Sequence, residues 1–489
     1  MTVDKKTTII IPHHLAERHK VIPVEIRGKK LVLAMSDPTD YFAIDDVRLV
    51  SGYEVEPVIA AEEDILRAIR QSYEINYLVE KDAQKIAPEK TTGATVMEAA
   101  NDAPVISMVN SIISQAVKDR ASDIHIEPQE NSLRVRFRID GVLQEMASFP
   151  SNISPAIISR IKIMSGLNIA EKRLPQDGRI VVSEQIDLRV STLPTIFGEK
   201  ALMRILDKKS TLLDIESLGF STENLNRYKQ FYTRAYGMVL ITGPTGSGKT
   251  TTLYSTLDKI NSPDRNIVTI EDPVEYRISG SNQIQINPKA GLTFANGLRS
   301  ILRQDPDIIM VGEIRDNETA DIAIRAALTG HLVFSTLHTN DAPGAVTRLL
   351  DMGIEPYLVS SALLGVVAQR LVRLICPRCK ESYSPDPLDV EMRFLSKMFP
   401  ADFPPDGQIT LVRGAGCSYC HHTGYYGRMA IQEVMPVSSA IIEAVNSRAS
   451  SDIIASIAVR EGMETKIRDG IEKACQGMTT IAEVMRVAI

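Results

Sequence analysis

The sequence predicts a multidomain α/β protein built around a parallel, doubly wound nucleotide-binding core. Three observations carry this prediction. The chain has 489 residues, which is too long for one hydrophobic core, so about two to four domains are expected. A glycine-rich stretch lies between an apolar strand-like run at 238–242 and a helical run at 251–260. Downstream, apolar strand-like runs alternate with helical runs, as they do in parallel sheets.

The glycine-rich stretch fits the phosphate-binding pattern G-x-x-x-x-G-K-[ST] without a mismatch. It comprises Gly243, Pro244, Thr245, Gly246, Ser247, Gly248, Lys249 and Thr250, with Thr251 next along the helix. Glycines let the backbone N–H groups turn inward onto a phosphate, and the helix N-terminus adds positive potential there. Lys249 is expected to reach the β- and γ-phosphates of ATP, and the Thr250 hydroxyl to hold Mg²⁺.

Composition and charge exclude several classes of protein. Hydrophobic residues make up 44% and charged residues 24%, as in ordinary globular domains. The formal net charge of -6 argues against a protein that coats nucleic acid, so no direct nucleic-acid partner is expected. No apolar run approaches about 18 residues, and the N-terminus lacks the apolar segment of a secretory signal. We therefore expect no transmembrane segment and a cytoplasmic location.

Four regions follow from changes in composition and pattern. Residues 1–78 read as a small N-terminal α/β domain, with a hairpin around Gly28. Residues 79–101 are a polar linker with no hydrophobic period. Residues 102–208 form a second α/β domain, and residues 209–489 form the phosphate-loop domain with a helical C-terminal tail. In that tail, Cys475 is expected to be a small buried residue.

The second domain is rich in arginine. In the strand-like run 132–140, three arginines alternate with apolar residues, so period two places them on one face. That face is either simply solvated or directed at an anion or another subunit. Further strands carry Arg179, Arg189 and Arg204.

Acidic side chains follow the strands of the phosphate-loop domain. In doubly wound sheets the ligand lies at the carboxyl ends of the strands. Glu313 directly follows the apolar run 308–311, and we prefer it as the catalytic base. Glu271 and Glu275 follow the preceding strand and are expected to hold metal or water, or in the case of Glu275 to be only solvated. His331 and His338 flank the next strand, where a histidine either contacts the γ-phosphate or packs in the core.

Two C-x-x-C pairs predict a structural zinc site within 376–420. Cys376, Cys379, Cys417 and Cys420 supply the four thiolates of a tetrahedral zinc ion. A redox-active pair is the alternative, and His421 or His422 is an alternative ligand.

Several segments together resemble one family. They are G-P-T-G-S-G-K-T-T-T, T-I-E-D-P-V-E-Y, L-R-Q-D-P-D-I-I-M-V-G-E-I-R-D, T-G-H-L-V-F-S-T-L-H-T-N and A-Q-R-L-V-R-L-I-C, with S-D-I-H-I-E-P, R-L-P-Q-D-G-R and S-T-L-P-T-I-F-G-E-K upstream. This set looks like the secretion ATPase superfamily, which includes the type II secretion ATPase (general secretion pathway protein E) and the type IV pilus assembly and retraction ATPases. Retraction ATPases resemble the chain less, because they lack the paired cysteines and the extra N-terminal domain.

The resemblance implies a RecA-like ATPase core, a PAS-like second domain and a homohexameric ring. Carried over by motif, 243–250 is the Walker A loop, 271–275 the Asp box, 305–313 Walker B and 331–338 the His box. Arg179, Arg189 and Arg204 fall in segments that supply phosphate-facing arginines in this family. The implied catalytic set is therefore Glu313, Lys249, Glu271, His338 and these three arginines, with ATP, Mg²⁺ and Zn²⁺ as cofactors.

The implied function is a cytoplasmic, ATP-hydrolysing motor. It would sit peripherally at the inner membrane and drive assembly of a pilin-like fibre for type II secretion, through a platform protein and a cytoplasmic-domain partner. Residues 1–78 and the zinc region are the expected docking parts. A type IV pilus assembly or DNA-uptake motor is the main alternative, and a nucleotide-binding regulator without hydrolysis is another. The N-terminus lacks the R-L-G-x-x-L repeat of family members that bind cyclic di-GMP.

Overall fold

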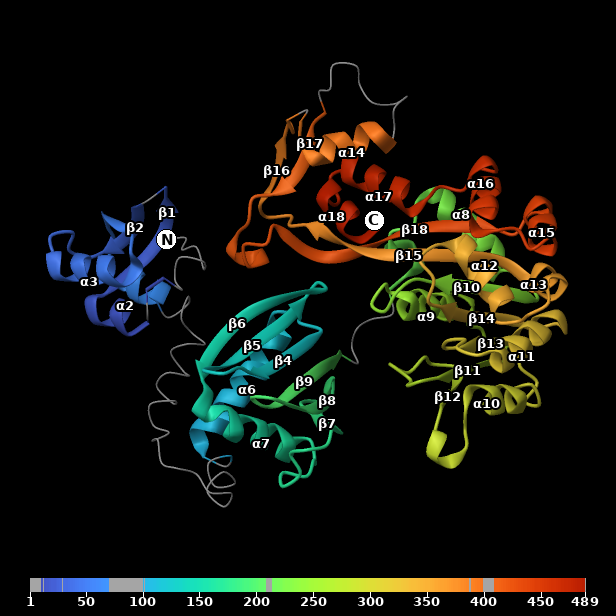
Figure 1. Ribbon diagram of the computed structural model, residues 1–489, viewed down its shortest axis with the longest axis horizontal. Helices are drawn as coiled ribbons and strands as arrows, with labels where there is room; N and C mark the ends of the chain where they lie inside the picture. Colours follow the sequence, from blue (N-terminus) through green and yellow to red (C-terminus); the bar gives the residue numbers. More distant parts are fainter. Residues whose placement is uncertain are drawn as a thin grey trace. The chain divides into compact units, whose positions relative to one another are not determined.

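The computed structural model describes residues 10–11, 13–28, 30–69, 100, 102–207, 213–386, 388–398 and 409–488 (Figure 1). The chain divides into two compact units. The first is Met1–Lys209 with Ala415–Gly424, and the second is Ser210–Gly414 with Tyr425–Ile489. Apart from Ala100, the predicted linker 79–101 lies outside the described residues.

A three-stranded sheet with its own core occupies the N-terminal part of the first unit. Its elements are α2 (His13–His19), β1 (Val21–Arg27), β2 (Lys30–Met35), α3 (Tyr41–Ser51) and β3 (Glu54–Ile59), followed by a helix at 62–69. Strands β1 and β2 form the predicted hairpin, and Gly28 at its turn has φ of 63°. That left-handed conformation suits glycine, which has no Cβ. Strand β3 pairs with β2 in parallel.

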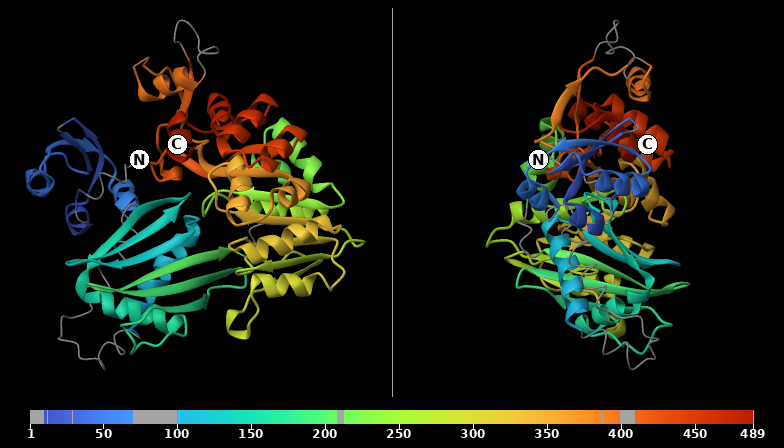
Figure 2. Two further views of the ribbon diagram at one scale, coloured as in Figure 1. Left: turned by 45° about the vertical axis from the view of Figure 1, so that its right-hand side comes forward. Right: turned by 90° about the vertical axis from the view of Figure 1, so that its left-hand side faces the viewer.

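Residues 102–207 of the first unit form a six-stranded antiparallel sheet with two helices. The elements are α6 (Ala103–Lys118), β4 (Asp123–Pro128), β5 (Ser132–Ile139), β6 (Val142–Pro150), α7 (Ser154–Met164), β7 (Gln176–Val181), β8 (Ile186–Thr195) and β9 (Gly198–Asp207). The strand order is β6-β5-β4-β9-β8-β7. Helices α6 and α7 cover one face, where the alternate apolar residues of the strands are buried (Figure 2). The charged residues of the strands therefore occupy the other face.

A seven-stranded sheet forms the centre of the second unit. Its order is β12-β11-β13-β14-β10-β15-β18, parallel throughout except for β18, which pairs antiparallel with β15. The strands are β10 (Gly237–Thr242), β11 (Ile267–Glu271), β12 (Ser281–Gln285), β13 (Ile308–Val311), β14 (Leu332–Leu337), β15 (Leu363–Ile375) and β18 (Tyr425–Pro436). The helices are α8 (Thr222–Tyr232), α9 (Lys249–Ile260), α10 (Phe294–Ile301), α11 (Asn317–Leu328), α12 (Ala342–Asp351), α13 (Pro356–Ala362), α15 (Ser439–Asn446) and α16 (Ser451–Arg460).

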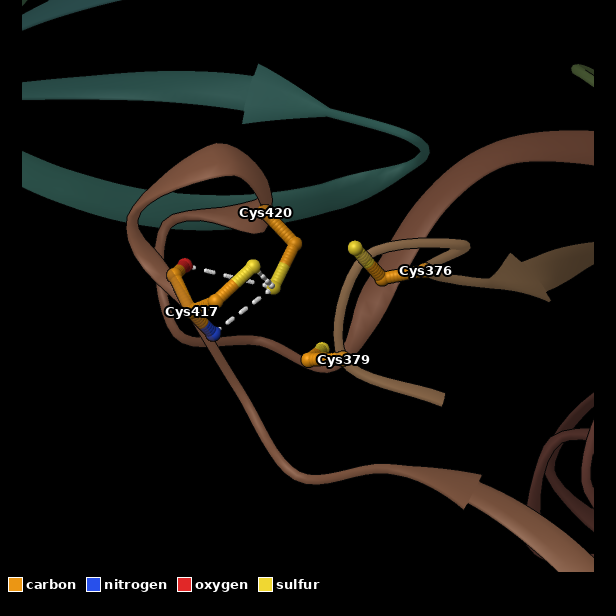
Figure 3. Close-up of side chains that lie close together, drawn as sticks. All are labelled: Cys376, Cys379, Cys417 and Cys420. Atoms are coloured by element: carbon orange, nitrogen blue, oxygen red, sulfur yellow. Dashed lines mark hydrogen bonds between the residues drawn. The ribbon is translucent and has the colours of Figure 1, made fainter. Parts of the chain in front are cut away.

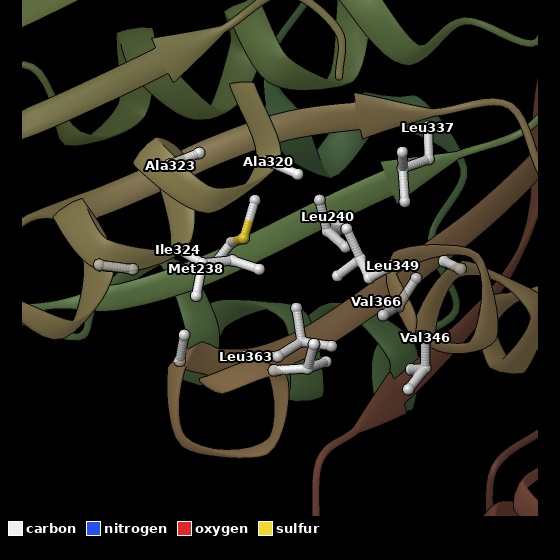
Figure 4. Close-up of a cluster of buried hydrophobic side chains, with 14 of the residues drawn as sticks. Met238, Leu240, Ala320, Ala323, Ile324, Leu337, Val346, Leu349, Leu363 and Val366 are labelled. Carbon is white, nitrogen blue, oxygen red and sulfur yellow. The ribbon is translucent and has the colours of Figure 1, made fainter. Parts of the chain in front are cut away.

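Two hydrophobic cores hold this sheet between helices, as the alternating runs predict. Met238 and Leu240 of β10 point into a core with α11, α12 and β15 (Figure 4). Val239 and Ile241, one position on, point into the opposite core with α8 and α9. Because β10 is buried on both faces, its end is held in one place, and that end carries the phosphate-binding loop.

Further elements complete the second unit. They are β16 (Lys380–Tyr383), α14 (Val390–Met398), β17 (Leu411–Gly414), α17 (Lys466–Cys475) and α18 (Ile481–Ala488), with short 3-10 helices at Ile215–Leu218 and Pro288–Ala290. The first unit has short 3-10 helices at Ser151–Ile153 and Ser418–Cys420. The prediction for Cys475 is wrong, because this residue is exposed. Ile471 and Ala474 form the inward face of α17, and Cys475 lies beside that face. No helix among the described residues is long and apolar enough to span a membrane.

Candidate active site

The phosphate-binding loop joins β10 to α9 at the carboxyl end of the sheet. Gly243, Gly246 and Gly248 have φ of 146°, 79° and 89°. A Cβ on Gly243 would lie 2.5 Å from the backbone oxygen of Gln369 and 2.6 Å from Ser247 Oγ. The first glycine of the motif is thus required by close packing as well as by its backbone angle.

Lys249 is buried against the loop, with only 9% of its surface exposed. Its Nζ donates to the carbonyl of Gly243 at 2.7 Å and to that of Pro244 at 3.1 Å. Burial lowers the pKa of Lys249 to about 8, Glu313 acts in the opposite direction, and Arg370 adds to the lowering. Glu313 and Arg370 therefore act on the pKa of Lys249 in opposite directions. Thr250, the next residue, is exposed in the first turn of α9.

Two residues of β15 that the sequence analysis did not assign to the site support this loop. Gln369 is 1% exposed, donates through Nε2 to the Ser247 carbonyl at 2.8 Å and accepts from Thr252 Oγ1 at 2.9 Å. Arg370 follows it, and one of its terminal nitrogens donates to Asn340 Oδ1 at 3.0 Å. Its Nε is buried without a partner among the described residues, and burial lowers the pKa of the guanidinium. Both residues lie in the segment A-Q-R-L-V-R-L-I-C, which is one of those that carry the family resemblance. The sequence does not show that this segment lies beside the phosphate-binding loop.

Glu313 lies just beyond β13, on the same edge of the sheet as the phosphate-binding loop. Arg315 donates to Glu313 Oε1 at 2.6 Å, and His338 Nε2 lies 3.2 Å from Oε2. Burial raises the pKa of Glu313, but the hydrogen bond and charge of Arg315, with a smaller contribution from His338, hold it below its ordinary value. The side chain is therefore ionised and held by both neighbours.

Glu271 is buried at the end of β11, with 3% of its surface exposed. Both carboxylate oxygens accept hydrogen bonds from neighbouring side chains, those of Tyr254, Thr269 and Gln283. Burial raises its pKa, and these hydrogen bonds oppose that rise. Glu275 follows in the next loop, and its backbone N–H donates to the Tyr254 hydroxyl at 3.3 Å.

The two histidines of the His box lie at opposite ends of β14. His338 follows the carboxyl end and contacts Glu313, as above. His331 precedes the strand, and its Nδ1 lies 2.9 Å from the carbonyl oxygen of Ala326 in α11. The backbone N–H of Gly237, the first residue of β10, donates a hydrogen bond to the His331 carbonyl. His331 thus lies at the edge of the sheet away from the phosphate-binding loop, where its ring contacts a carbonyl in the last turn of α11.

The three predicted arginines of the first unit lie in one row across its sheet. Arg179 is the cross-strand partner of Arg189, and Arg189 is the partner of Arg204. The row continues through Asp123 to Arg138. Asp123 accepts from Arg204 at 2.9 Å and lies 3.5 Å from Arg138, while Asp187 binds Arg179. The row carries more positive than negative charge.

The arginines of β5 give a mixed outcome for the two predicted alternatives. The apolar residues of the strand are buried and the arginines partly exposed, as period two predicts. Glu127 accepts from Arg134, Arg136 and Lys200 within the sheet at 3.2, 2.9 and 2.9 Å. Burial alone would raise the pKa of Glu127, but hydrogen bonds from Arg136 and Lys200 lower it to about 2. Arg134 and Arg136 are therefore bound to an internal acid, whereas Arg138 joins the row.

The four cysteines of the two C-x-x-C pairs gather at one point (Figure 3). Their sulfur atoms all lie within 4.8 Å of one another, and Cys376 and Cys420 are buried. The Cys417 N–H donates to Cys420 Sγ at 3.2 Å. Four convergent thiols fit a tetrahedral zinc site, which confirms the predicted cluster. Neither His421 nor His422 belongs to this group among the described residues, and His421 Nε2 lies 3.3 Å from Asp119.

Known proteins resemble this chain over most of its length. Residues 98–486 match the family described as Type II/IV secretion system protein, and residues 1–75 match the MshEN domain. The chain is 49% identical over 490 residues to the type IV pilus assembly ATPase PilB of Myxococcus xanthus, covering 97% of this chain and 85% of that protein. It is 45% identical over 490 residues to the type II secretion system protein E of Aeromonas hydrophila, covering 98% and 96%. Identity to the type II secretion system ATPase E of Vibrio cholerae is 49% over 417 residues, covering 83% and 80%.

Solved structures show the same fold. The pilus retraction motor PilT with bound ADP aligns with a TM-score of 0.51 at 25% identity, over 77% of this chain and 96% of that one. The ATPase DotB of Legionella pneumophila aligns with a TM-score of 0.56 at 20% identity, over 82% and 97%, which concerns the fold alone. The family match spans most of the chain and includes every segment on which the resemblance rests. The chain therefore belongs to the Type II/IV secretion system protein family and is an ATPase of that family.

Proposed function

We propose that this chain is the ATP-hydrolysing motor of a type II secretion machine, acting at the cytoplasmic face of the inner membrane. The observation that carries the catalytic part is that Glu313 follows β13 and Lys249 follows β10, so both lie at the carboxyl edge of one parallel sheet. A carboxylate that can orient or deprotonate the attacking water, beside a lysine that binds the phosphates, is an arrangement suited to hydrolysis of a nucleoside triphosphate. The transport role is supported by the type II secretion relatives, of which that of Aeromonas hydrophila matches almost end to end.

The residues divide the reaction between them. Backbone N–H groups of the loop and Lys249 would bind the β- and γ-phosphates, and the Thr250 hydroxyl would hold Mg²⁺, which would supply positive charge against the phosphates. Glu313 orients or deprotonates the attacking water, and Arg315 and His338 hold its two oxygens. Arg370, whose Nε is buried without a partner among the described residues, adds positive charge near Lys249.

The arginine row supplies further positive charge for the transition state. Neighbouring strands of the first unit carry Arg179, Arg189 and Arg204 as cross-strand partners. A γ-phosphate in contact with one of these arginines would therefore also be attracted by the charge of the others. Their contact with nucleotide would occur within one chain or between chains of a homohexamer. Closing and opening of that contact during the ATP cycle would be the motion passed to the membrane platform. Residues 1–78 and the zinc region would dock on partner proteins.

A type IV pilus assembly motor is the second candidate. It is favoured by the 49% and 48% identity to PilB of Myxococcus xanthus and Thermus thermophilus. The chain spans 54% of the length of the Thermus protein, against 96% of the Aeromonas type II protein. We place secretion first because type II secretion system proteins from several species match this chain at 42–49% identity.

Two measurements test the proposal. Purified protein should hydrolyse ATP, and duplex DNA should not stimulate it; an inactive protein that binds ATP would support a regulator instead. A deletion strain of the host, complemented with wild type or with Glu313→Gln, separates the two machines. Loss of extracellular enzymes with normal surface pili supports secretion, and the reverse result supports pilus assembly.

A further inference from the structure

A buried network of hydrogen bonds centres on Glu271. Its Oε1 accepts from Thr269 Oγ1 at 2.6 Å and from Gln283 Nε2 at 3.1 Å, and its Oε2 accepts from the Tyr254 hydroxyl. Tyr254 and Thr269 are fully buried, and Glu271 is 3% exposed. Both carboxylate oxygens are thus enclosed by protein donors, which meets the requirement of a buried carboxylate without a metal ion.

The same network holds the loop that carries Glu275. The Tyr254 hydroxyl accepts from the Glu275 backbone N–H at 3.3 Å. Gln283 donates to the Tyr276 carbonyl at 3.1 Å and accepts from the Ile278 N–H at 2.7 Å. The rings of Tyr254 and Tyr276 also meet edge to face, with centroids 4.5 Å apart. Three backbone groups of the loop after β11 therefore depend on two side chains that Glu271 orients.

Tyr254 connects this loop to the phosphate-binding helix. It lies on α9, the helix that begins at Lys249. Glu271 therefore ties the helix that starts in the phosphate-binding loop to the segment bearing Glu275. A ligand of Mg²⁺ needs an oxygen open to the metal, whereas Glu271 is 3% exposed, with two hydrogen bonds accepted by Oε1 and one by Oε2.

We propose that Glu271 and Tyr254 are positioning residues for ATP hydrolysis. They set the loop at 272–280, with Glu275, against helix α9 and the bound phosphates. Neither side chain touches nucleotide or metal. This inference deepens the proposed function and rests on the ATPase activity of the chain, since the loop is positioned for that reaction.

The test uses the full-length protein with Tyr254→Phe, Glu271→Gln and Tyr228→Phe. Tyr228→Phe is a matched control, because Tyr228 is also fully buried and its hydroxyl lies 2.7 Å from Thr256 Oγ1 of α9. Among the hydrogen bonds of the described residues, none joins Tyr228 to Glu271. Tyr254→Phe should lower kcat about tenfold, which is the effect expected when one hydrogen bond that positions the loop is lost. KM for ATP should stay within about twofold, and the Mg²⁺ concentration for half-maximal activity should not change. Tyr228→Phe should leave kcat near wild type.

Hydrogen exchange of nucleotide-free protein gives a second readout that needs no activity. The peptide over 272–280 should exchange at least about fivefold faster in Tyr254→Phe than in wild type or in Tyr228→Phe. Glu271→Gln retains an oxygen acceptor and should show an intermediate loss of kcat. The inference is overturned if Glu271→Gln shifts the Mg²⁺ half-point tenfold while Tyr254→Phe behaves as wild type, since Glu271 would then be a metal ligand. Wild-type protein without ATP turnover would instead contradict the proposed function, and the exchange result would still test the network.

Discussion

Arg189 of β8 lies directly opposite Arg204 of β9, and Arg179 of β7 lies opposite Arg189 on its other side. Like charges directly opposite each other in a sheet reduce stability. Asp123 and Asp187 bind the outer members, Arg204 and Arg179. A fold that keeps three arginines in one row across neighbouring strands concentrates positive charge, which suits contact with a polyanion such as a triphosphate.

The arginine row gives the first prediction. Arg189→Ala should lower ATP turnover at least about tenfold, because positive charge for the transition state is lost, while the free energy of unfolding should change by no more than about 0.5 kcal/mol, as is usual for a partly exposed side chain. Steady-state ATPase assays and urea unfolding measure the two quantities. Arg134→Ala is the control, since Arg134 lies on the same face of the sheet but outside the row, where it is bound to Glu127. Equal turnover in both variants would mean that the row is only a solvated surface.

The assignment of the base is tested at Glu313. Glu313→Gln should lower kcat about 100-fold or more, because the amide cannot accept the proton of the attacking water. Affinity for a fluorescent ATP analogue should be retained. Lys249→Ala should instead abolish nucleotide binding, since the ammonium group next to the phosphates is lost. Unchanged turnover in Glu313→Gln would show that another group acts as the base.

Arg315 should control the pH dependence of turnover. Its hydrogen bond and charge hold the pKa of Glu313 below the ordinary value against the effect of burial. Arg315→Ala should therefore raise the pKa of Glu313, and the carboxylate should be protonated at higher pH. The acid limb of the kcat profile should move to higher pH, which rates measured from pH 4.5 to 8 will show. Arg299→Ala removes an exposed arginine paired with Glu318, away from the site, and should leave the limb unmoved.

The cysteine cluster predicts about one zinc ion per chain. Cys376→Ser should lose the metal and lower the melting temperature, because a structural zinc site contributes to folding. Metal analysis by mass spectrometry and thermal unfolding measure both effects. Cys475→Ser is the matched control, since Cys475 is exposed and outside the cluster. A stable, metal-free wild-type protein would contradict the prediction.

Glu127 should make the first unit sensitive to acid. Its pKa is lowered to about 2 in the folded protein, against 4.5 as its ordinary value. A depressed carboxylate stabilises the fold above pH 4.5 and loses that contribution as the pH falls towards 2. Wild type should exceed Glu127→Gln by about 1–2 kcal/mol in free energy of unfolding at pH 7, after allowance for solvent screening of the half-exposed partners. The difference should shrink between pH 5 and pH 2.5; a constant difference would show that Glu127 acts through packing alone.

Local patterns predicted much of this protein. The strand, glycine loop and helix at 237–260 follow from residue type and spacing, because hydrogen bonding and steric limits act over a few residues there. The C-x-x-C pairs likewise predicted a four-cysteine cluster, since each turn brings two thiols together locally. His331 and His338 were harder to separate, because seven residues of spacing do not show that a strand runs between them and sends each to a different edge.

Residue types and their local spacing define the chemistry available to this protein, namely a phosphate-binding loop, an acid after a strand, a supply of arginines and four thiols. Which of these groups meet depends on how the segments pack in three dimensions. Cross-strand register placed Arg179, Arg189 and Arg204 in one row, and packing of α9 against β11 enclosed Glu271 under the Tyr254 hydroxyl. Those relationships join residues far apart along the chain. They depend on which strands pair and in which register, and the spacing of residues within one segment does not specify either.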